Sequence, residues 1–124
     1  MAWVTRMKPL YWIGSSKKSL QSLPDEVRDT FGYALYLAQK GGKHCQSKPL
    51  KGYGGSGVIE IVEDFSGNTY RAVYTVKFPN GLYVLHIFQK KSSSGISTSK
   101  LDKATIHQRL KIAENHAKGA AYES

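Results

Sequence analysis

Acidic side chains are scarce in this sequence, which holds nine Asp and Glu residues against 18 Lys and Arg residues in a chain of 124. The net charge is +9, and neither residues 30–59 nor residues 65–101 contain a carboxylate. This surplus favours a polyanionic partner, either nucleic acid or an acidic protein. Because charge also keeps proteins soluble, a basic surface without a specific partner stays open as an alternative.

Cysteine is almost absent as well. Cys45 is the single thiol, which excludes an intramolecular disulfide framework and suits a reducing cytoplasm. No run approaches the roughly 18 apolar residues of a membrane span, and residues 1–8 lack the apolar core of a signal peptide. We therefore expect a cytoplasmic protein with no membrane partner, built as one domain over residues 1–124.

Signatures of metal and cofactor chemistry are also missing. His44 and Cys45 are neighbours, but no further ligands follow at the spacing of a zinc site. The glycine-rich segment 51–57 lacks the Walker spacing and precedes a predicted strand, whereas a phosphate loop precedes a helix. No nucleophile-elbow, Ser-His-Asp or kinase signature is present. We expect no metal and no cofactor, so any catalysis relies on bases and cationic phosphate clamps.

Hydrophobic periodicity predicts an α+β domain. Ser15-Ser16 and Pro24 are favourable starts for two helices, the second of which ends at Gly41-Gly42. A basic loop covers residues 43–57, and an apolar stripe after Asp102, the expected N-cap, indicates a last helix. Strands are expected at residues 8–13, 58–63, 69–78 and 82–89. The predicted order is β-α-α-β-β-β-α, with the helices packed on one face of an antiparallel sheet.

Strand alternation places three cations on one face of this sheet. If Asn80-Gly81 forms a two-residue hairpin loop, Arg71 lies opposite Lys90, and Thr75 lies opposite His86. A register slip of one residue would bring Tyr70 and Tyr74, instead of Arg71, to the face that carries His86 and Lys90. Like charges on one face repel, so this convergence favours an anion-binding site. The opposite face is more apolar and is expected against the helices; it carries Tyr70, Ala72, Tyr74, Val76, Tyr83, Leu85 and Ile87.

Each of the three cations also has a purely structural interpretation. Arg71 can pair with Glu60 or Glu63 across the sheet. A single histidine such as His86 is weak evidence for chemistry without partners. The Lys90-Lys91 pair can protect a strand end from aggregation. The anion site therefore depends on the three residues acting together.

Four segments carry a resemblance to a known family. They are Lys48-Pro49-Leu50-Lys51-Gly52, Glu60-Ile61, Tyr70-Arg71-Ala72-Val73-Tyr74 and Leu85-His86-Ile87-Phe88-Gln89-Lys90-Lys91-Ser92. In this order and spacing the chain resembles the RelE/ParE/HigB toxin superfamily, and most closely its phage-derived HigB-like branch. The resemblance implies a RelE-like, microbial-ribonuclease-like sheet. It also implies the toxin of a type II toxin–antitoxin system that cleaves mRNA on the ribosome and is neutralised by a cognate helix-turn-helix, HigA-like antitoxin.

Within this resemblance, the cationic face fits RNA cleavage by attack of a ribose 2′-OH on the adjacent phosphate. His86 is the candidate general base or acid, Arg71 offers a planar fork to phosphate oxygens, and Lys90 adds charge in the transition state. The candidate RNA-binding residues are Lys48, Lys51 and Lys91 for flanking phosphates and Tyr53 or Phe88 for base stacking. Many members of the superfamily end their last strand in a catalytic Tyr or His near the C-terminus. Here a predicted helix follows instead, so a lysine in place of His86 stays open as the proton-transfer residue.

Two other functions are compatible with the same scaffold. The first is a ParE-like inhibitor of DNA gyrase, which binds a protein and needs no phosphate-cleaving face. The second is a non-catalytic module that binds nucleic acid or protein. The convergence of Arg71, His86 and Lys90 favours the endoribonuclease over both, since fold-level analogy alone does not establish function.

Overall fold

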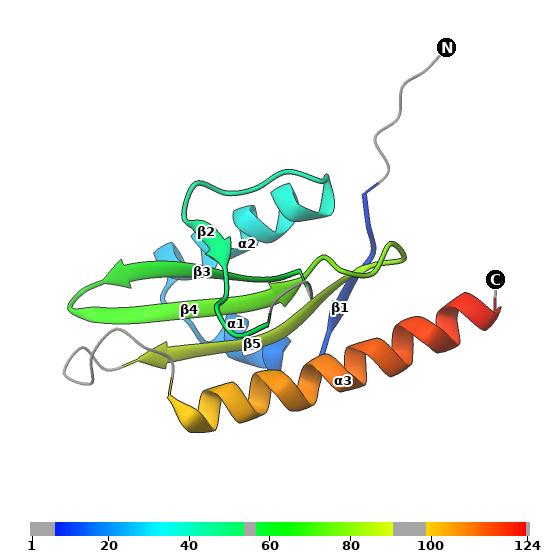
Figure 1. The fold of residues 1–124 in the computed structure, drawn as a ribbon. Coiled ribbons are helices and arrows are strands. Elements are labelled where there is room, and N and C mark those ends of the chain that lie inside the picture. Colours follow the sequence, from blue (N-terminus) through cyan, green and yellow to red (C-terminus); the bar gives the residue numbers. More distant parts are fainter. Residues whose placement is uncertain (1–6, 54–56, 91–98, 124) are drawn as a thin grey trace, which may run out of the picture.

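A mixed five-stranded sheet forms the centre of the computed structural model, which describes residues 7–53, 57–90 and 99–123. Its strands lie in the order β1-β5-β4-β3-β2 (Figure 1). β1 runs parallel to β5, and the other neighbours are antiparallel, so the prediction of a purely antiparallel sheet is wrong. The strands are β1 (Leu10–Trp12), β2 (Ser47–Pro49), β3 (Val58–Phe65), β4 (Asn68–Thr75) and β5 (Leu82–Lys90).

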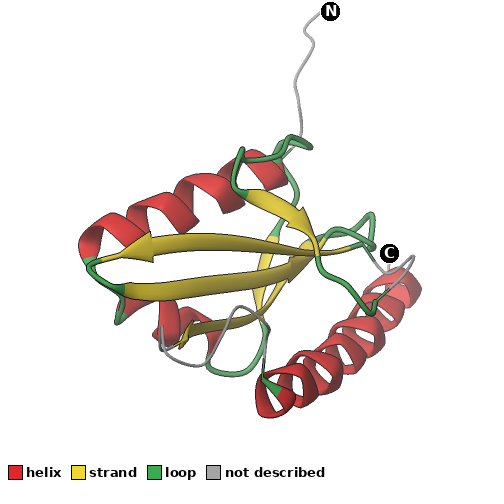
Figure 2. Cartoon of the chain, turned by 60° about the vertical axis from the view of Figure 1, so that its left-hand side comes forward, coloured by secondary structure: helices red, strands yellow, loops and turns green. Residues whose placement is uncertain are grey.

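Helices cover both faces of this sheet. α1 (Ser16–Gln21) and α2 (Asp25–Gln39) lie on one side, and α3 (Lys100–Glu123) lies on the other (Figures 1 and 2). The α+β class is confirmed, but the prediction that all helices pack on one face is wrong. No helix in the described ranges is both long and apolar enough to cross a lipid bilayer.

Two hydrophobic cores result from this three-layer arrangement. Phe31 of α2 packs in the first core and Ile106 of α3 in the second, and neither has measurable exposure. The interior strand β5, which lies between β1 and β4, supplies Val84 to the first core and Tyr83 and Leu85 to the second. A strand covered on both faces is expected to be apolar at consecutive positions, and the first four residues of β5 are all 0% exposed.

The short strand β2 lies within the segment predicted as a basic loop. Its residues Lys48 and Pro49 pair with Glu60 and Ile59 of β3. Three residues are too few for a periodic signal, and proline in a strand is tolerated here because β2 forms the edge of the sheet. The observed order is therefore β-α-α-β-β-β-β-α.

The two hairpins of the sheet differ in their turns. Phe65 at the end of β3 pairs with Asn68 at the start of β4, so Ser66 and Gly67 form a two-residue loop. Their φ angles of 52° and 82° are positive, as a tight hairpin loop of this length requires. The connection between β4 and β5 spans residues 76–81, longer than the predicted Asn80-Gly81 turn. This length and a β-bulge in β5 together shift the register at Arg71 by two residues from the prediction, so Arg71 lies opposite Phe88 instead of Lys90.

A β-bulge in β5 changes which side chains face each helix layer. Val73 and Tyr74 are consecutive in β4, but they pair with His86 and Val84, so Leu85 is an extra residue in β5. The alternation of faces is interrupted there. The predicted grouping of Tyr83, Leu85 and Ile87 on one face is wrong, because Ile87 packs in the α2 core and the other two pack in the α3 core.

Polar contacts fasten α3 to the sheet at the bulge. Arg109 Nη1 donates a hydrogen bond to the Leu85 carbonyl at 3.0 Å, and Nη2 donates to Ser15 Oγ at 3.3 Å. At the start of the helix, Ser99 Oγ accepts a hydrogen bond from the Asp102 backbone N–H at 3.1 Å. Ser99 is therefore the N-cap, three residues before the predicted one.

Candidate functional site

One row of side chains crosses four strands on the α3 side of the sheet. Pairing brings Lys48 of β2 beside Glu60 of β3, Glu60 beside Val73 of β4, and Val73 beside His86 of β5. Further along β4, Arg71 lies opposite Phe88. Directly paired residues point to the same face. We call this group the α3-side face, and its polar and aromatic members are Lys48, Glu60, Arg71, His86, Phe88 and Lys90.

A buried ion pair occupies the centre of the α3-side face. Arg71 Nη1 donates a hydrogen bond to Glu60 Oε2 at 2.8 Å, and the two side chains are only 8% and 6% exposed. Lys48 Nζ lies 3.6 Å from Glu60 Oε1, but its side chain is 63% exposed. The structural alternative for Arg71, a cross-strand pair with Glu60, is therefore present. The carboxylate offsets part of the positive charge and fixes the guanidinium in one orientation.

Lys90 lies at the end of β5 on the same face, opposite Thr69. The residue is only 9% exposed, and within the described ranges no carboxylate forms an ion pair with it. Burial of a lysine without a carboxylate partner is costly, so an anion bound here would offset that cost. Among the described residues, Lys90 is thus the member of the predicted triad that has no carboxylate partner.

His86 makes its main polar contact with α3. Its Nε2 lies 2.8 Å from Asp102 Oδ1, and its ring stacks on Phe88 with the centroids 4.5 Å apart. Burial lowers the pKa of His86 below its usual 6.5, and Asp102 offsets this lowering in part. The neutral imidazole then donates from Nε2 to Asp102, which leaves Nδ1 as the basic nitrogen. Nδ1 is buried and has no hydrogen-bond partner in the described part of the chain.

The pKa shift of His86 makes stability depend on pH. A histidine whose pKa is lower in the folded than in the unfolded chain contributes its full stability above about pH 6.5 and loses it as the pH falls. We expect the urea midpoint of the wild type to fall between about pH 7.5 and about pH 5.5, and the fall to be smaller in His86→Gln. His107→Gln, an exposed position on α3, is the control. An equal pH dependence in all three proteins would contradict this assignment.

Two of the remaining predicted RNA contacts, Lys51 and Tyr53, lie in the segment that follows β2. Lys51 is exposed at a turn, whereas Tyr53 is half-buried and its hydroxyl donates to the Lys103 carbonyl of α3 at 3.2 Å. Burial also raises the pKa of Tyr53. Tyr53 thus helps to hold α3 through its hydroxyl, and base stacking by its ring stays a prediction. Lys91 lies outside the described residues.

A protein-family comparison covers the elements that build this face. Residues 18–111 match the model of the family described as Phage derived protein Gp49-like (DUF891). The chain belongs to the Gp49-like family. This is a RelE/toxin-like family associated with the toxins of toxin–antitoxin systems, and membership implies an antitoxin partner in general. No curated protein and no solved structure matches the chain significantly.

The Gp49-like match includes every described member of the α3-side face. It begins in α1 and ends within α3, just after Arg109. The α3 residues that contact the bulge and His86 therefore belong to the family region. Strands β2 to β5 and the first part of α3 thus lie within the family region, whereas β1 precedes it.

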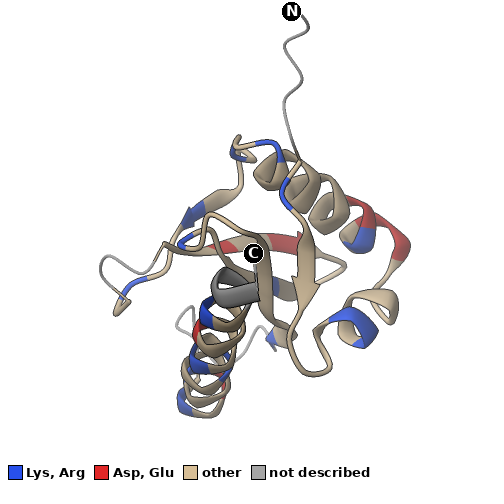
Figure 3. Cartoon of the chain, turned by 90° about the vertical axis from the view of Figure 1, so that its right-hand side faces the viewer, with Lys and Arg blue, Asp and Glu red and all other residues tan. Residues whose placement is uncertain are grey.

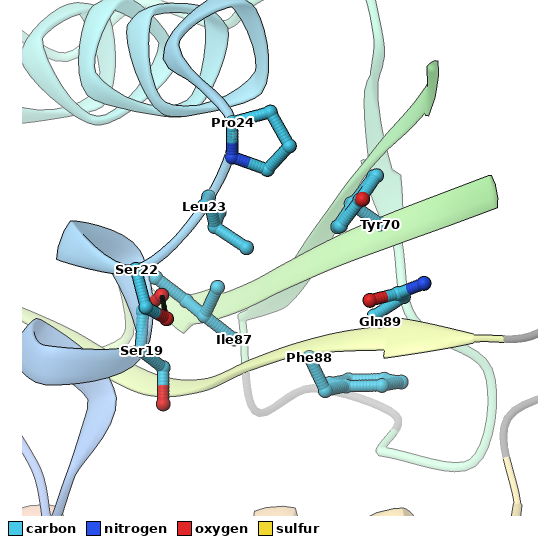
Figure 4. A pocket seen from close by; sticks show the side chains of 8 residues that line it. All are labelled: Ser19, Ser22, Leu23, Pro24, Tyr70, Ile87, Phe88 and Gln89. Atoms are coloured by element: carbon cyan, nitrogen blue, oxygen red, sulfur yellow. Dashed lines mark hydrogen bonds between the residues drawn. The ribbon is translucent and has the colours of Figure 1, made fainter. Parts of the chain in front are cut away.

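A pocket lies on the other side of this Gp49-like domain, beside α1. It has a volume of about 540 Å³ and lies between the α1–α2 connection and the ends of β4 and β5 (Figure 4). None of its lining residues is charged; they are Ser19, Ser22, Leu23, Pro24, Tyr70, Ile87, Phe88 and Gln89. It therefore offers no cation to a phosphate, and the α3-side face remains the candidate for RNA chemistry.

Two carboxylates of the site were not predicted as functional. Glu60 was given no catalytic or RNA-binding role, only a place in the family resemblance and an alternative pairing with Arg71, and Asp102 was considered as a helix cap. In the structure each contacts a predicted catalytic residue at 2.8 Å. Carboxylates are rare in this basic chain, and β3 carries three of them, Glu60, Glu63 and Asp64, so their concentration in one strand was the available signal. The contact of Asp102 with His86 required the position of α3, which the sequence did not provide.

Proposed function

We propose that the protein is the toxin of a type II toxin–antitoxin system, in the HigB-like branch, and that it cleaves mRNA on the ribosome. The observation that carries the proposal is membership of the Gp49-like family. The net charge of +9 is consistent with a ribonucleoprotein target. The cognate antitoxin is then an HigA-like helix-turn-helix protein, as the resemblance implies.

In the proposed reaction, a ribose 2′-oxygen attacks the adjacent phosphorus and displaces the 5′-oxygen of the next nucleotide. The products are a 2′,3′-cyclic phosphate and a 5′-hydroxyl end. The proton leaves the 2′-OH for a base, and a proton is given to the departing 5′-oxygen. Charge that develops on the phosphoryl oxygens requires fixed cations close by.

The geometry of the α3-side face supports a division of these tasks. Arg71, oriented by Glu60, and the enclosed Lys90 are suited to the reacting phosphate, while the exposed Lys48 is suited to a flanking one. His86 can accept a proton only at Nδ1 while Nε2 donates to Asp102. Because Nδ1 is buried, proton transfer by His86 requires RNA binding to open its contact with α3. Proton transfer by a lysine has no such requirement.

The test is to induce the protein in bacteria and to map 5′-hydroxyl ends across the transcriptome. We expect new ends inside translated reading frames within minutes of induction. A matched reporter message without a ribosome-binding site should stay intact, because the proposed cleavage needs a translating ribosome. Growth arrest with intact messages would contradict the proposal and favour gyrase inhibition. Equal cutting of both reporters would show a nuclease that does not depend on the ribosome.

A second candidate function, a non-catalytic binding module, has one observation in its favour. Arg71 is paired with a carboxylate, and both Arg71 and Lys90 are less than 10% exposed. Such burial is also what a purely structural role would produce. Under this alternative, induction would cause no new 5′ ends and no growth arrest.

A further inference from the structure

The outer side of α2, across the sheet from α3, carries an exposed aromatic cluster. Tyr33 and Tyr36 are 56% and 40% exposed, although each is a large apolar ring. Their centroids are 6.5 Å apart at an interplanar angle of 28°, as expected for residues three apart on a helix. α2 packs on the sheet through other residues, among them Phe31 and Ala34. The two tyrosines therefore have no role in the core.

The chain that follows α2 adds a third ring to this cluster. Gly41, with φ of 88°, ends the helix, and Gly42 N–H donates to the Leu37 carbonyl at 2.8 Å. This helix end turns the chain back, so that the His44 ring meets Tyr33 edge-on with the centroids 5.9 Å apart. His44 Nδ1 accepts a hydrogen bond from Gln46 N–H at 3.0 Å, which holds the ring in place. The rings thus form a fixed surface.

Positive charge lies at one end of the cluster. Lys40 Nζ lies 4.7 Å from the Tyr36 ring centroid, over its face, and Lys43 follows as an exposed residue. Figure 3 shows acidic residues in red at the N-terminal end of α2, opposite the end that carries the lysines. Asp29 is one helical turn before Tyr33. Glu63 approaches only at Gln46, whose side-chain amide donates to it at 3.3 Å. An anion is therefore favoured at the end with the two lysines. We call the set Tyr33, Tyr36, Lys40, Lys43 and His44 the α2 patch.

We propose that the α2 patch binds single-stranded RNA, as a second RNA contact on the side of the sheet opposite the proposed cleavage face. Exposed aromatic faces stack unpaired bases, and neighbouring lysines neutralise the phosphates between them. The patch supplies both on one rigid helix end. Binding here does not use Arg71, His86 or Lys90, so the inference does not depend on the cleavage step.

RNA fits this surface better than a protein partner does. The patch carries two lysines, Lys40 and Lys43, and no carboxylate, whereas protein interfaces are depleted in lysine. A lysine near a helix C-terminus also has a structural role, since it offsets the helix dipole. The experiment must therefore distinguish the contribution of the tyrosine rings to RNA affinity from that of the lysine charges.

The experiment measures the affinity of the purified full-length protein for a fluorescein-labelled RNA of about 12 unpaired nucleotides by anisotropy. We expect Tyr33→Ala/Tyr36→Ala to weaken binding at least about tenfold, because two stacking rings are removed. Tyr33→Phe/Tyr36→Phe keeps both rings and should bind as the wild type does. Lys40→Ala/Lys43→Ala should reduce the slope of log affinity against log salt by about 1.4.

Controls keep this test decisive. Ile112→Ala removes an exposed apolar side chain of α3, 47% exposed, and should leave RNA affinity unchanged. Circular dichroism melts show that each variant is folded. Equal affinity of the wild type and the double alanine variant would overturn the proposal. If Tyr33→Ala/Tyr36→Ala also remains toxic when the cognate antitoxin is co-expressed, the patch binds a protein. Because the RNA is measured uncut, a failed cleavage assay leaves this result untouched.

Discussion

Replacing Glu60 by glutamine should lower the free energy of unfolding by about 3–5 kcal/mol. The substitution removes the charge that pairs with Arg71, whose side chain is only 8% exposed. A buried guanidinium without its carboxylate loses a strong charge-assisted hydrogen bond, and it keeps the cost of having left water. Urea unfolding followed by far-ultraviolet circular dichroism measures the change.

Lys48 provides the matched comparison for Glu60. It also approaches the carboxylate, at 3.6 Å, but its side chain is 63% exposed. Exposed ion pairs contribute roughly 0–1 kcal/mol, so Lys48→Ala should cost no more than that. If Glu60→Gln is as mild as Lys48→Ala, water reaches the pair and the ion pair is not a determinant of stability.

The buried Arg71–Glu60 pair also complicates any activity test that substitutes Arg71 alone. Arg71→Ala leaves the Glu60 carboxylate buried and unpaired, so the variant is destabilised for the same reason as Glu60→Gln. A loss of toxicity would then follow from unfolding as readily as from lost chemistry. The structural and chemical roles of Arg71 are separated only in a variant that stays folded.

Much of the fold follows from local sequence signals. Pro24 and Gly41-Gly42 mark the ends of α2, and the apolar residues between them follow the helical period. Ser66-Gly67 marks the hairpin between β3 and β4, because a tight turn needs residues that tolerate positive φ. These signals lie within a few residues of the structure that they specify, so they can be read without tertiary information.

The side of the sheet on which α3 packs depends on tertiary structure. The prediction that α3 lies on the same face as α1 and α2 is wrong. The stripe that includes Ile106 and Leu110 shows that α3 has a buried face, but a stripe does not show which layer covers it. The evidence was in β5, where Leu82 to Leu85 are apolar at every position. Consecutive apolar residues indicate burial on both faces, and the assumption of strict alternation concealed this.

The predicted site kept its shared face despite a wrong register. From Val73 and His86 to the end of β5, the pairing of β4 with β5 differs from the prediction by two residues, and a shift of two leaves these side chains on their original side. Arg71, His86 and Lys90 therefore still share the α3-side face. The pairing of Arg71 with Glu60 was among the alternatives read from the sequence, but the partner of His86 could not be predicted, because its contact with Asp102 depends on α3 and on the bulge at Leu85.

The double variant Glu60→Met/Arg71→Leu separates stability from chemistry. It replaces both members of the buried pair with apolar side chains, so neither charge is left unpaired. Such replacements are often neutral or stabilising. We expect the free energy of unfolding to return to within about 1 kcal/mol of the wild type, and urea unfolding of the single and double variants measures this recovery.

The same double variant should still fail to cleave RNA. If Arg71 contacts the reacting phosphate, removing its guanidinium should reduce cleavage of a translated message at least about 100-fold, since fixed groups that stabilise transition-state charge are worth that much. Cleavage is measured with purified ribosomes and matched amounts of the wild type, Lys48→Ala and the double variant. A stable double variant that cleaves at the wild-type rate would make Arg71 purely structural and move the chemistry elsewhere. A stable, inactive one places the guanidinium in the reaction, because the fold no longer accounts for the loss.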